Sequence, residues 1–228
     1  MLLGGMLLTF RWQQQLVLLI HVNYLNLATV TGVLLLSLGS YQFLRPRQTA
    51  ASNTGHVSIF TPHLGAILLL STALLGLWVN PKPLSGQTAL NRGVSQHLSV
   101  TRDQPQAFRP QVNPEERTLL DWIRTLEVFP DPYTYEHQPV NVDGFVVHPE
   151  DAPAKTFLLA RFLISCCAAD AYPVALPTRW TDSESLEADR WYRVQGRMAV
   201  QAGQEQPQIL IQAEQVIPIP TPVNPYAN

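Results

Sequence analysis

Carboxylate side chains are absent from the first 102 residues of this 228-residue chain, and all 17 Asp and Glu residues lie from Asp103 onward. The first 81 residues also hold only three basic side chains, those of Arg11, Arg45 and Arg47. A soluble domain needs many charged residues on its surface. The scarcity of charge therefore excludes an ordinary soluble fold for this region and favours a membrane-embedded one.

Two uncharged stretches in this region are apolar enough to cross a bilayer. They run from about Leu16 to Leu44 and from about Val57 to Val79, and each contains an apolar stretch of the ~20 residues that a spanning helix needs. Residues 1–10 are apolar but too short to span alone, so they form either an interfacial segment or the end of a further helix. No basic residue precedes them, so a signal peptide is not expected. We predict membrane helices within residues 1–79, two or three in number, in a multi-pass membrane protein.

The few basic residues bear on the orientation in the membrane. Arg45 and Arg47 lie between the two stretches, and the positive-inside rule places such a loop in the cytoplasm. The second stretch would then carry the C-terminal domain to the extracytoplasmic side. Lys82 and Arg92, which follow the second stretch, favour the opposite arrangement. We expect the C-terminal domain to be extracytoplasmic.

Basic residues are also scarce in the C-terminal half. From Arg102 to the end there are 10 Lys and Arg residues against 17 Asp and Glu, a balance of minus seven. Nucleic-acid binding depends on basic side chains that neutralise phosphates, so no nucleic-acid partner is expected. The chain also has no GxxxxGK[ST], GxGxxG or HExxH motif. These absences favour a protein that is not an enzyme.

Prolines and polar residues dominate residues 80–113, which is typical of a tether. A helix is expected to follow, with Asn113 as its N-cap and Glu116 at the capping-box position. Apolar residues then recur at helical spacing until Pro130. The tether therefore leads into a folded domain that begins at residue 114.

Beyond this helix the apolar period changes to two, which indicates strands. Gly144 and Gly196 lie mid-strand, where bulges would help a barrel to close, and Thr181–Asp189 has room for one short helix. We predict a small, mainly β domain over residues 114–228, an OB-like five-stranded barrel with one preceding helix. The five expected strands are residues 140–147, 156–167, 172–176, 191–200 and 208–217.

Cysteine is confined to one adjacent pair, Cys166 and Cys167. On a continuous strand the two side chains would point to opposite faces, with Cys166 toward the core and Cys167 toward a partly polar face. Adjacent cysteines lack the C-x-x-C spacing of zinc knuckles, and a disulfide between them would close a strained ring. They are either small buried side chains or ligands of a soft metal ion, with His148 and Asp170 as further candidate ligands. A Cys167–His148 catalytic dyad is a further alternative.

The apolar N-terminal region contains a candidate cluster of polar side chains, those of His21, Asn23, Tyr24 and His63. Polar groups at membrane depth face other helices or a cavity and mark a pathway. Alternatively they lie at the membrane interface, where water satisfies them. Both interpretations stay open.

Three segments resemble a known family. They are Leu19–Tyr24, Ala89–Gly93 and, most specifically, the segment Arg161–Ala171 around the cysteines. On these motifs the chain resembles the YcgQ-like family of bacterial permease subunits, although Val22 stands where the family pattern has Pro. The resemblance implies an N-terminal membrane part, a C-terminal domain of OB character and a separate polytopic permease as partner in the bacterial plasma membrane. It implies no catalytic residues.

These observations lead to two functional expectations. The first is a non-enzymatic accessory subunit of a two-component permease, whose barrel caps or gates the polytopic partner or presents a solute. The second is a membrane-anchored module that binds a soft metal or performs thiol redox chemistry through Cys166 and Cys167. The bilayer is a partner in both cases.

Overall fold

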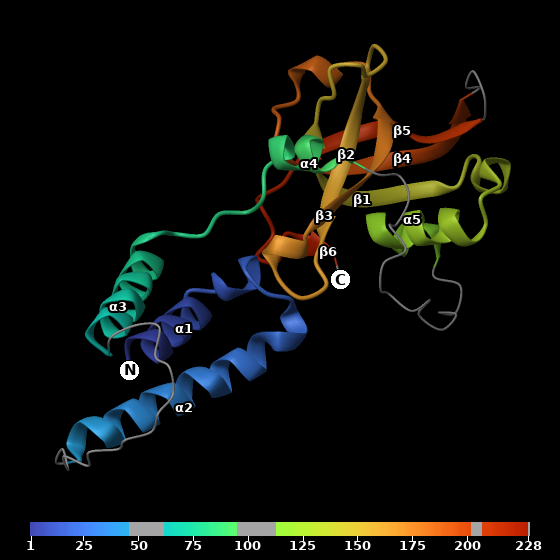
Figure 1. Ribbon diagram of the computed structural model, residues 1–228. Coiled ribbons are helices and arrows are strands. Elements are labelled where there is room, and N and C mark those ends of the chain that lie inside the picture. The colour runs from blue at the N-terminus through green and yellow to red at the C-terminus, as the bar shows by residue number, and fades with distance from the viewer. Residues whose placement is uncertain (46–61, 95–112, 202–206, 228) are drawn as a thin grey trace. The chain divides into compact units, whose positions relative to one another are not determined.

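A computed structural model describes residues 1–45, 62–94, 113–201 and 207–227 of the chain. The chain divides into two compact units. The first comprises Met1–Lys82 together with Cys166–Ala168, and the second comprises Pro83–Ser165 together with Ala169–Asn228. Helices form most of the first unit, whereas strands dominate the second (Figure 1).

The described part of the first unit contains the helices α1 (Leu2–Trp12), α2 (Leu25–Leu44) and α3 (Pro62–Trp78). Two 3₁₀ turns, Leu16–Leu18 and Val22–Tyr24, connect α1 to α2. The apolar residues at the N-terminus therefore form a helix. Glycine allows α1 and α2 to pack closely, because a Cβ atom on Gly4 would lie 2.6 Å from the carbonyl oxygen of Gly32.

One helical stretch in the described residues, Val22–Leu44, has the length and composition to cross a membrane. It has 23 residues, and only 6% of its most apolar 18-residue stretch is buried within the protein. A membrane anchor and an N-terminal signal sequence share these properties. The second predicted span is not shown, because α3 has 17 residues and is shorter than such a helix; residues 57–61 of that prediction lie outside the described residues.

The bounds of α2 follow from local chemistry. His21 has an extended backbone, and its Nδ1 atom accepts a hydrogen bond from the backbone N–H of Asn23 at 3.2 Å. This bond starts the 3₁₀ turn that leads into α2. The helix ends at Leu44, and Arg45 is again extended. Pro46 follows in the sequence, and a residue before proline disfavours the helical region.

The second unit is built on a closed ring of five strands: β1 (Pro139–Val147), β2 (Thr156–Leu163), β3 (Tyr172–Arg179), β4 (Trp191–Gln201) and β5 (Gln208–Pro218). β1 pairs antiparallel with both β2 and β4, and β4 pairs antiparallel with β5. A parallel pairing between β5 and β3 and an antiparallel pairing between β3 and β2 complete the ring. The predicted five-stranded barrel is therefore confirmed. A short strand, β6 (Tyr226–Ala227), adds to β2 in parallel.

Two glycines are required where the strands bend. At Phe145, the residue after Gly144, β1 pairs with both β4 and β2, and a Cβ atom on Gly144 would lie 2.8 Å from the carbonyl oxygen of Ala160. At Gly196, the register between β4 and β5 shifts, and a Cβ atom would lie 2.1 Å from the carbonyl oxygen of Gln212. Both positions are therefore closed to any larger residue, as expected for bends that close a barrel.

The barrel interior is filled by side chains. One buried apolar cluster receives residues from all five strands and from helix α5 (Leu119–Val128). Its largest fully buried members include Trp122, Phe157, Leu159, Met198 and Ile211. A second buried cluster lies around Phe145, Phe162 and Trp191 and includes Ala89 of α4 (Gly86–Arg92) and Tyr226 of β6.

Helix α5 begins later than the sequence suggests. Thr118 is its N-cap: the Thr118 hydroxyl accepts from the N–H of Asp121 at 3.2 Å, and the Asp121 carboxylate accepts from the N–H of Thr118 at 3.1 Å. The prediction of Asn113 and Glu116 as the capping pair is wrong. Their side chains bond each other at 3.3 Å beside a separate 3₁₀ turn, Pro114–Glu116. Arg117 then adopts an extended backbone, which separates the two helical pieces.

The described residues after α5 contain three further 3₁₀ turns: Pro132–Tyr135, Ala168–Asp170 and Ser183–Ser185. The last of these occupies the predicted helical insert. Part of the predicted tether, residues 80–113, is also structured. Ser85 caps α4, and Ala89 of α4 is fully buried in the second cluster. Residues 84–94 therefore belong to the packed part of the barrel unit, while residues 95–112 lie outside the described part of the chain.

Candidate functional site

The cysteines lie in the loop between β2 and β3, and not on a strand. The pairing of these strands ends at Leu163 opposite Tyr172, so residues 164–171 must reverse the chain. The predicted strand 156–167 is therefore too long by four residues. With the strand ended, alternation no longer applies, and the predicted inward Cys166 is wrong: Cys166 is exposed and Cys167 is half-buried.

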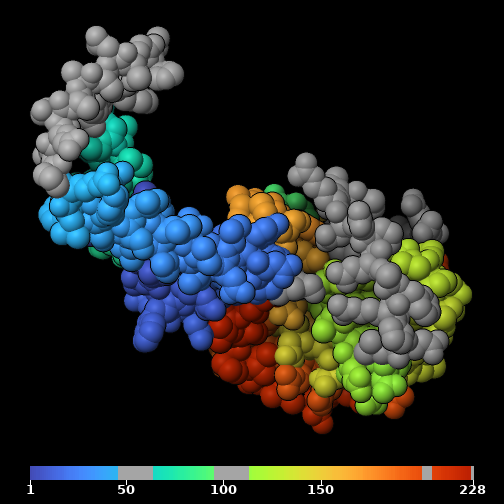
Figure 2. Space-filling view, turned by 90° about the horizontal axis from the view of Figure 1, so that it is seen from below, coloured from blue at the N-terminus to red at the C-terminus, as the bar shows by residue number. Residues whose placement is uncertain are grey.

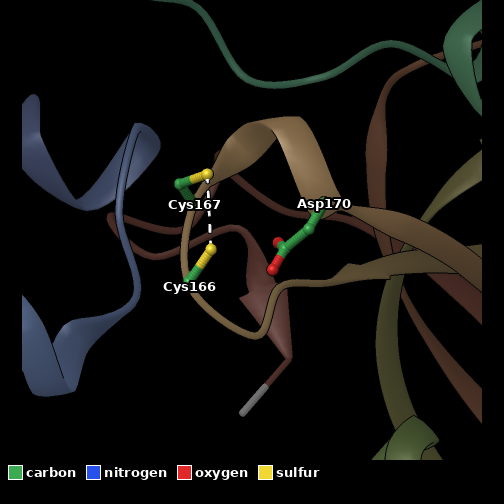
Figure 3. A group of neighbouring side chains, drawn as sticks. All are labelled: Cys166, Cys167 and Asp170. Carbon is green, nitrogen blue, oxygen red and sulfur yellow. Dashed lines mark hydrogen bonds between the residues drawn. The ribbon is translucent and has the colours of Figure 1, made fainter. Parts of the chain in front are cut away.

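The loop brings three candidate metal ligands together (Figure 3). The two sulfur atoms lie 3.5 Å apart and share a hydrogen bond. A carboxylate oxygen of Asp170 lies near both, since the three ligand atoms are all within 4.8 Å of one another. Neither cysteine forms a disulfide. Three of the four predicted ligands thus form one group.

Hydrogen bonds from backbone N–H groups, one of them to a side chain, hold this loop. The N–H of Ser165 donates to Oδ1 of Asp170 at 3.2 Å, and the turn Ala168–Asp170 places that carboxylate at the end of the loop. Within the first unit, the N–H of His21 donates to the carbonyl of Cys166 at 3.0 Å, and the N–H of Ala168 donates to the carbonyl of Leu19 at 2.8 Å. The backbone is thus fixed on both sides of the thiols.

An apolar hollow of about 380 Å³ borders the thiols within the first unit. Its lining is almost entirely apolar apart from the sulfur atoms and two hydroxyl groups. The cysteines therefore lie beside a surface that binds water poorly. The lining residues are Leu7, Ile20, Tyr24, Leu27, Ala28, Thr31, Cys166 and Cys167.

The fourth predicted ligand, His148, is not in the group of Cys166, Cys167 and Asp170. It follows β1, is exposed, and its Nε2 atom lies 2.9 Å from the carbonyl oxygen of Leu186. The His148 ring therefore forms a hydrogen bond with the segment that precedes β4. The Cys167–His148 catalytic dyad stays a prediction.

The predicted polar cluster of the membrane part is partly assembled. His21, Asn23 and Tyr24 share one 3₁₀ turn and its cap, and the rings of His21 and Tyr24 meet edge to face at 6.3 Å. His21 is half-buried, whereas Asn23 and Tyr24 are exposed. His63 lies in α3, and its side chain is outside the described residues.

Sequence reasoning missed the unusual surroundings of Arg161 on β2. Its guanidinium lies 5.3 Å over the ring of Trp191, and its Nε atom is buried without a hydrogen-bond partner. Burial lowers the pKa of Arg161, while the charge of Asp143 opposes that shift. The sequence did hold a signal for this. On a strand, Arg161 shares one side with Phe157, Leu159 and Leu163, so its charged side chain lies on a mostly apolar side.

Comparison with protein families gives a match over the second unit. The model of the DUF1980 C-terminal domain matches residues 99–228, a range that contains the whole barrel and the cysteine loop. A search of curated proteins gives no match. Because the matched range is more than half of its length, the chain belongs to the DUF1980 family.

Proposed function

We propose that this chain is a non-enzymatic accessory subunit of a two-component membrane permease. Helix α2 anchors the subunit in the bilayer of the bacterial plasma membrane, and the barrel is its soluble part. The barrel caps or gates a separate polytopic partner, or presents a solute to it.

The apolar surface of α2 carries this proposal. Nine of its large apolar side chains are exposed, and the helix contains no charged residue. In the space-filling view α2 is the long row of blue and light-blue atoms, whose side chains are largely visible at the surface (Figure 2). An apolar surface of this extent is stable only against lipid or other apolar helices. The exposed residues are Leu27, Val30, Val33, Leu34, Leu35, Leu38, Tyr41, Phe43 and Leu44.

A partner is proposed because this chain offers no conduit of its own in the described residues. The barrel interior is packed with side chains from every strand, so it is a core and not a pore. One helix alone cannot enclose a path across a bilayer. A transport path would therefore have to come from a polytopic partner, as the resemblance to the YcgQ-like permease subunits implies.

The barrel supports a role in binding protein or solute more than nucleic acid. Its ring of strands, with β3 parallel to β5, agrees with the expected OB-like plan. OB barrels that bind nucleic acid combine a basic groove with exposed stacking aromatics. Here the balance from Arg102 onward is minus seven, and the described ion pairs occupy Arg190, Arg193 and Arg197.

Co-purification tests the accessory role. The tagged full chain is extracted in a mild detergent and passed over an affinity and then a sizing column. One polytopic membrane protein should remain with it in a fixed ratio through both columns. A chain that elutes alone after mild extraction, with α2 intact, contradicts the proposal.

The extracytoplasmic position of the barrel has its own test. Both cysteines lie in one loop, and Cys166 is exposed, so the unmodified chain carries a natural topology probe. A membrane-impermeant maleimide added to intact cells after treatment with a metal chelator should label the chain, whereas a Cys166→Ser/Cys167→Ser variant should stay unlabelled. Labelling that requires lysed cells places the barrel in the cytoplasm instead.

A further inference from the structure

The end of β2 at Leu163 has a chemical consequence for Cys166 and Cys167. On a strand the two thiols would face apart, but the loop turns both sulfur atoms toward each other and toward Asp170 (Figure 3). We propose that Cys166, Cys167 and Asp170 bind one Zn²⁺ ion, with the fourth coordination position open. This site is independent of the accessory role proposed above.

The spacing of the sulfur atoms fits a tetrahedral ion. Two thiolates bound to Zn²⁺ at about 2.3 Å in tetrahedral geometry are separated by roughly 3.8 Å. The sulfur atoms here are 3.5 Å apart, so they need to move by only a few tenths of an ångström. A linear site with two thiolates would require the sulfur atoms to separate by twice the metal–sulfur distance. The geometry therefore favours Zn²⁺ over two-coordinate Cu⁺.

The third ligand supports the same choice. Soft ions such as Cu⁺ prefer sulfur, whereas Zn²⁺ binds thiolate and carboxylate together. The hydrogen bond from the N–H of Ser165 to Oδ1 of Asp170 holds the carboxylate beside the thiols. The three groups are thus close before any ion binds, which lowers the ordering cost of binding.

Binding changes the protonation of the site in a defined way. Each thiol loses one proton when its sulfur binds the ion, so one Zn²⁺ replaces two protons and the hydrogen bond between the sulfurs. Affinity must therefore rise with pH over the range in which thiols ionise. Three protein ligands leave one position for water or for an exchangeable ligand.

The test uses the full chain in detergent, reduced with a phosphine and stripped of metal. Titration with Co²⁺ should give one equivalent of a complex with a thiolate-to-metal charge-transfer band, and one equivalent of Zn²⁺ should remove that band. The Cys166→Ser/Cys167→Ser variant should lose the band. The Asp170→Asn variant should bind with an affinity lower by about tenfold or more.

Two matched control variants test whether side chains outside the group of Cys166, Cys167 and Asp170 bind the ion. His148→Gln removes the imidazole that the sequence suggests but the structure places on Leu186, and Asp151→Asn removes another exposed loop carboxylate. Both variants should bind Co²⁺ and Zn²⁺ as the unmodified chain does. Equal loss of binding in His148→Gln and in the double serine variant overturns the assignment.

A measurement on the unmodified chain guards against misfolded variants. Saturating Zn²⁺ should protect both thiols from alkylation, as counted by mass spectrometry of the intact chain. Unchanged alkylation overturns the proposal. Binding of Cu⁺ without a Co²⁺ charge-transfer band, or with no effect of Asp170→Asn, overturns it as well.

Discussion

Phe157 and Phe43 are the same side chain in opposite surroundings. Phe157 of β2 is 0% exposed inside the barrel, whereas Phe43 near the end of α2 is 83% exposed. The barrel unit buries its core apolar side chains inside a closed ring of strands. The helical unit leaves many of its apolar side chains, such as those of α2, exposed on its surface. The difference shows that the barrel unit is folded by its own core, and that α2 depends on its environment.

The largest expected effect compares these two phenylalanines. Phe157→Ala should lower the free energy of unfolding of the barrel by about 3–5 kcal/mol, because it leaves a cavity in a packed core. Phe43→Ala should change it by less than about 0.5 kcal/mol. Urea unfolding of the full chain in detergent, followed by tryptophan fluorescence, measures both. Equal losses of unfolding free energy in the two variants would contradict the contrast between a buried Phe157 and an exposed Phe43.

A charge in α2 tests the role of lipid. Leu34 is exposed in the middle of the apolar stretch, so Leu34→Lys should cost about 3 kcal/mol of insertion free energy. The expected result is a larger fraction of chain released from membranes by an alkaline wash. Val128→Lys, at an exposed position of α5, is the matched control and should stay in the membrane fraction. An unchanged distribution of Leu34→Lys would argue against α2 as the anchor.

The helix cap of the barrel unit gives a smaller effect. Thr118→Ala removes the hydroxyl of the capping box and should lower the free energy of unfolding by about 1 kcal/mol. Asn113→Ala should have a negligible effect, since Asn113 makes no cap hydrogen bond to the backbone. The same urea unfolding experiment compares them. A larger loss of unfolding free energy in Asn113→Ala than in Thr118→Ala would instead identify Asn113 as the N-cap.

Alkaline pH should affect the barrel slightly. Burial raises the pKa of Tyr226 above its ordinary value of 10.0, although the charge of Arg92 opposes the shift. Above pH about 10 the unfolded chain ionises this phenol first, so the free energy of unfolding should fall as pH rises. Tyr226→Phe should flatten the fall, and Tyr133→Phe, at an exposed ring, should not. Equal pH profiles for all three chains would contradict this account.

Much of the barrel could be predicted from the sequence because its patterns are local. Alternating apolar residues indicated all five strands, and Gly144 and Gly196 marked the bends. The cap of α5 was misplaced by five residues, because Asn113 and Thr118 both start plausible capping boxes. Arg117, extended and 4.7 Å over the ring of Trp122, separates the two. That contact depends on packing and leaves no local signal.

The sequence by itself indicated which part of the chain is poor in charge and which part builds a core, because charge and apolar period are properties of the residues alone. It also determined that all thiol chemistry lies at Cys166 and Cys167. Only the tertiary structure decided how those thiols are presented. The pairing of β2 with β3 ends at Leu163, and this long-range limit turns two side chains that would face apart into neighbours 3.5 Å apart beside Asp170.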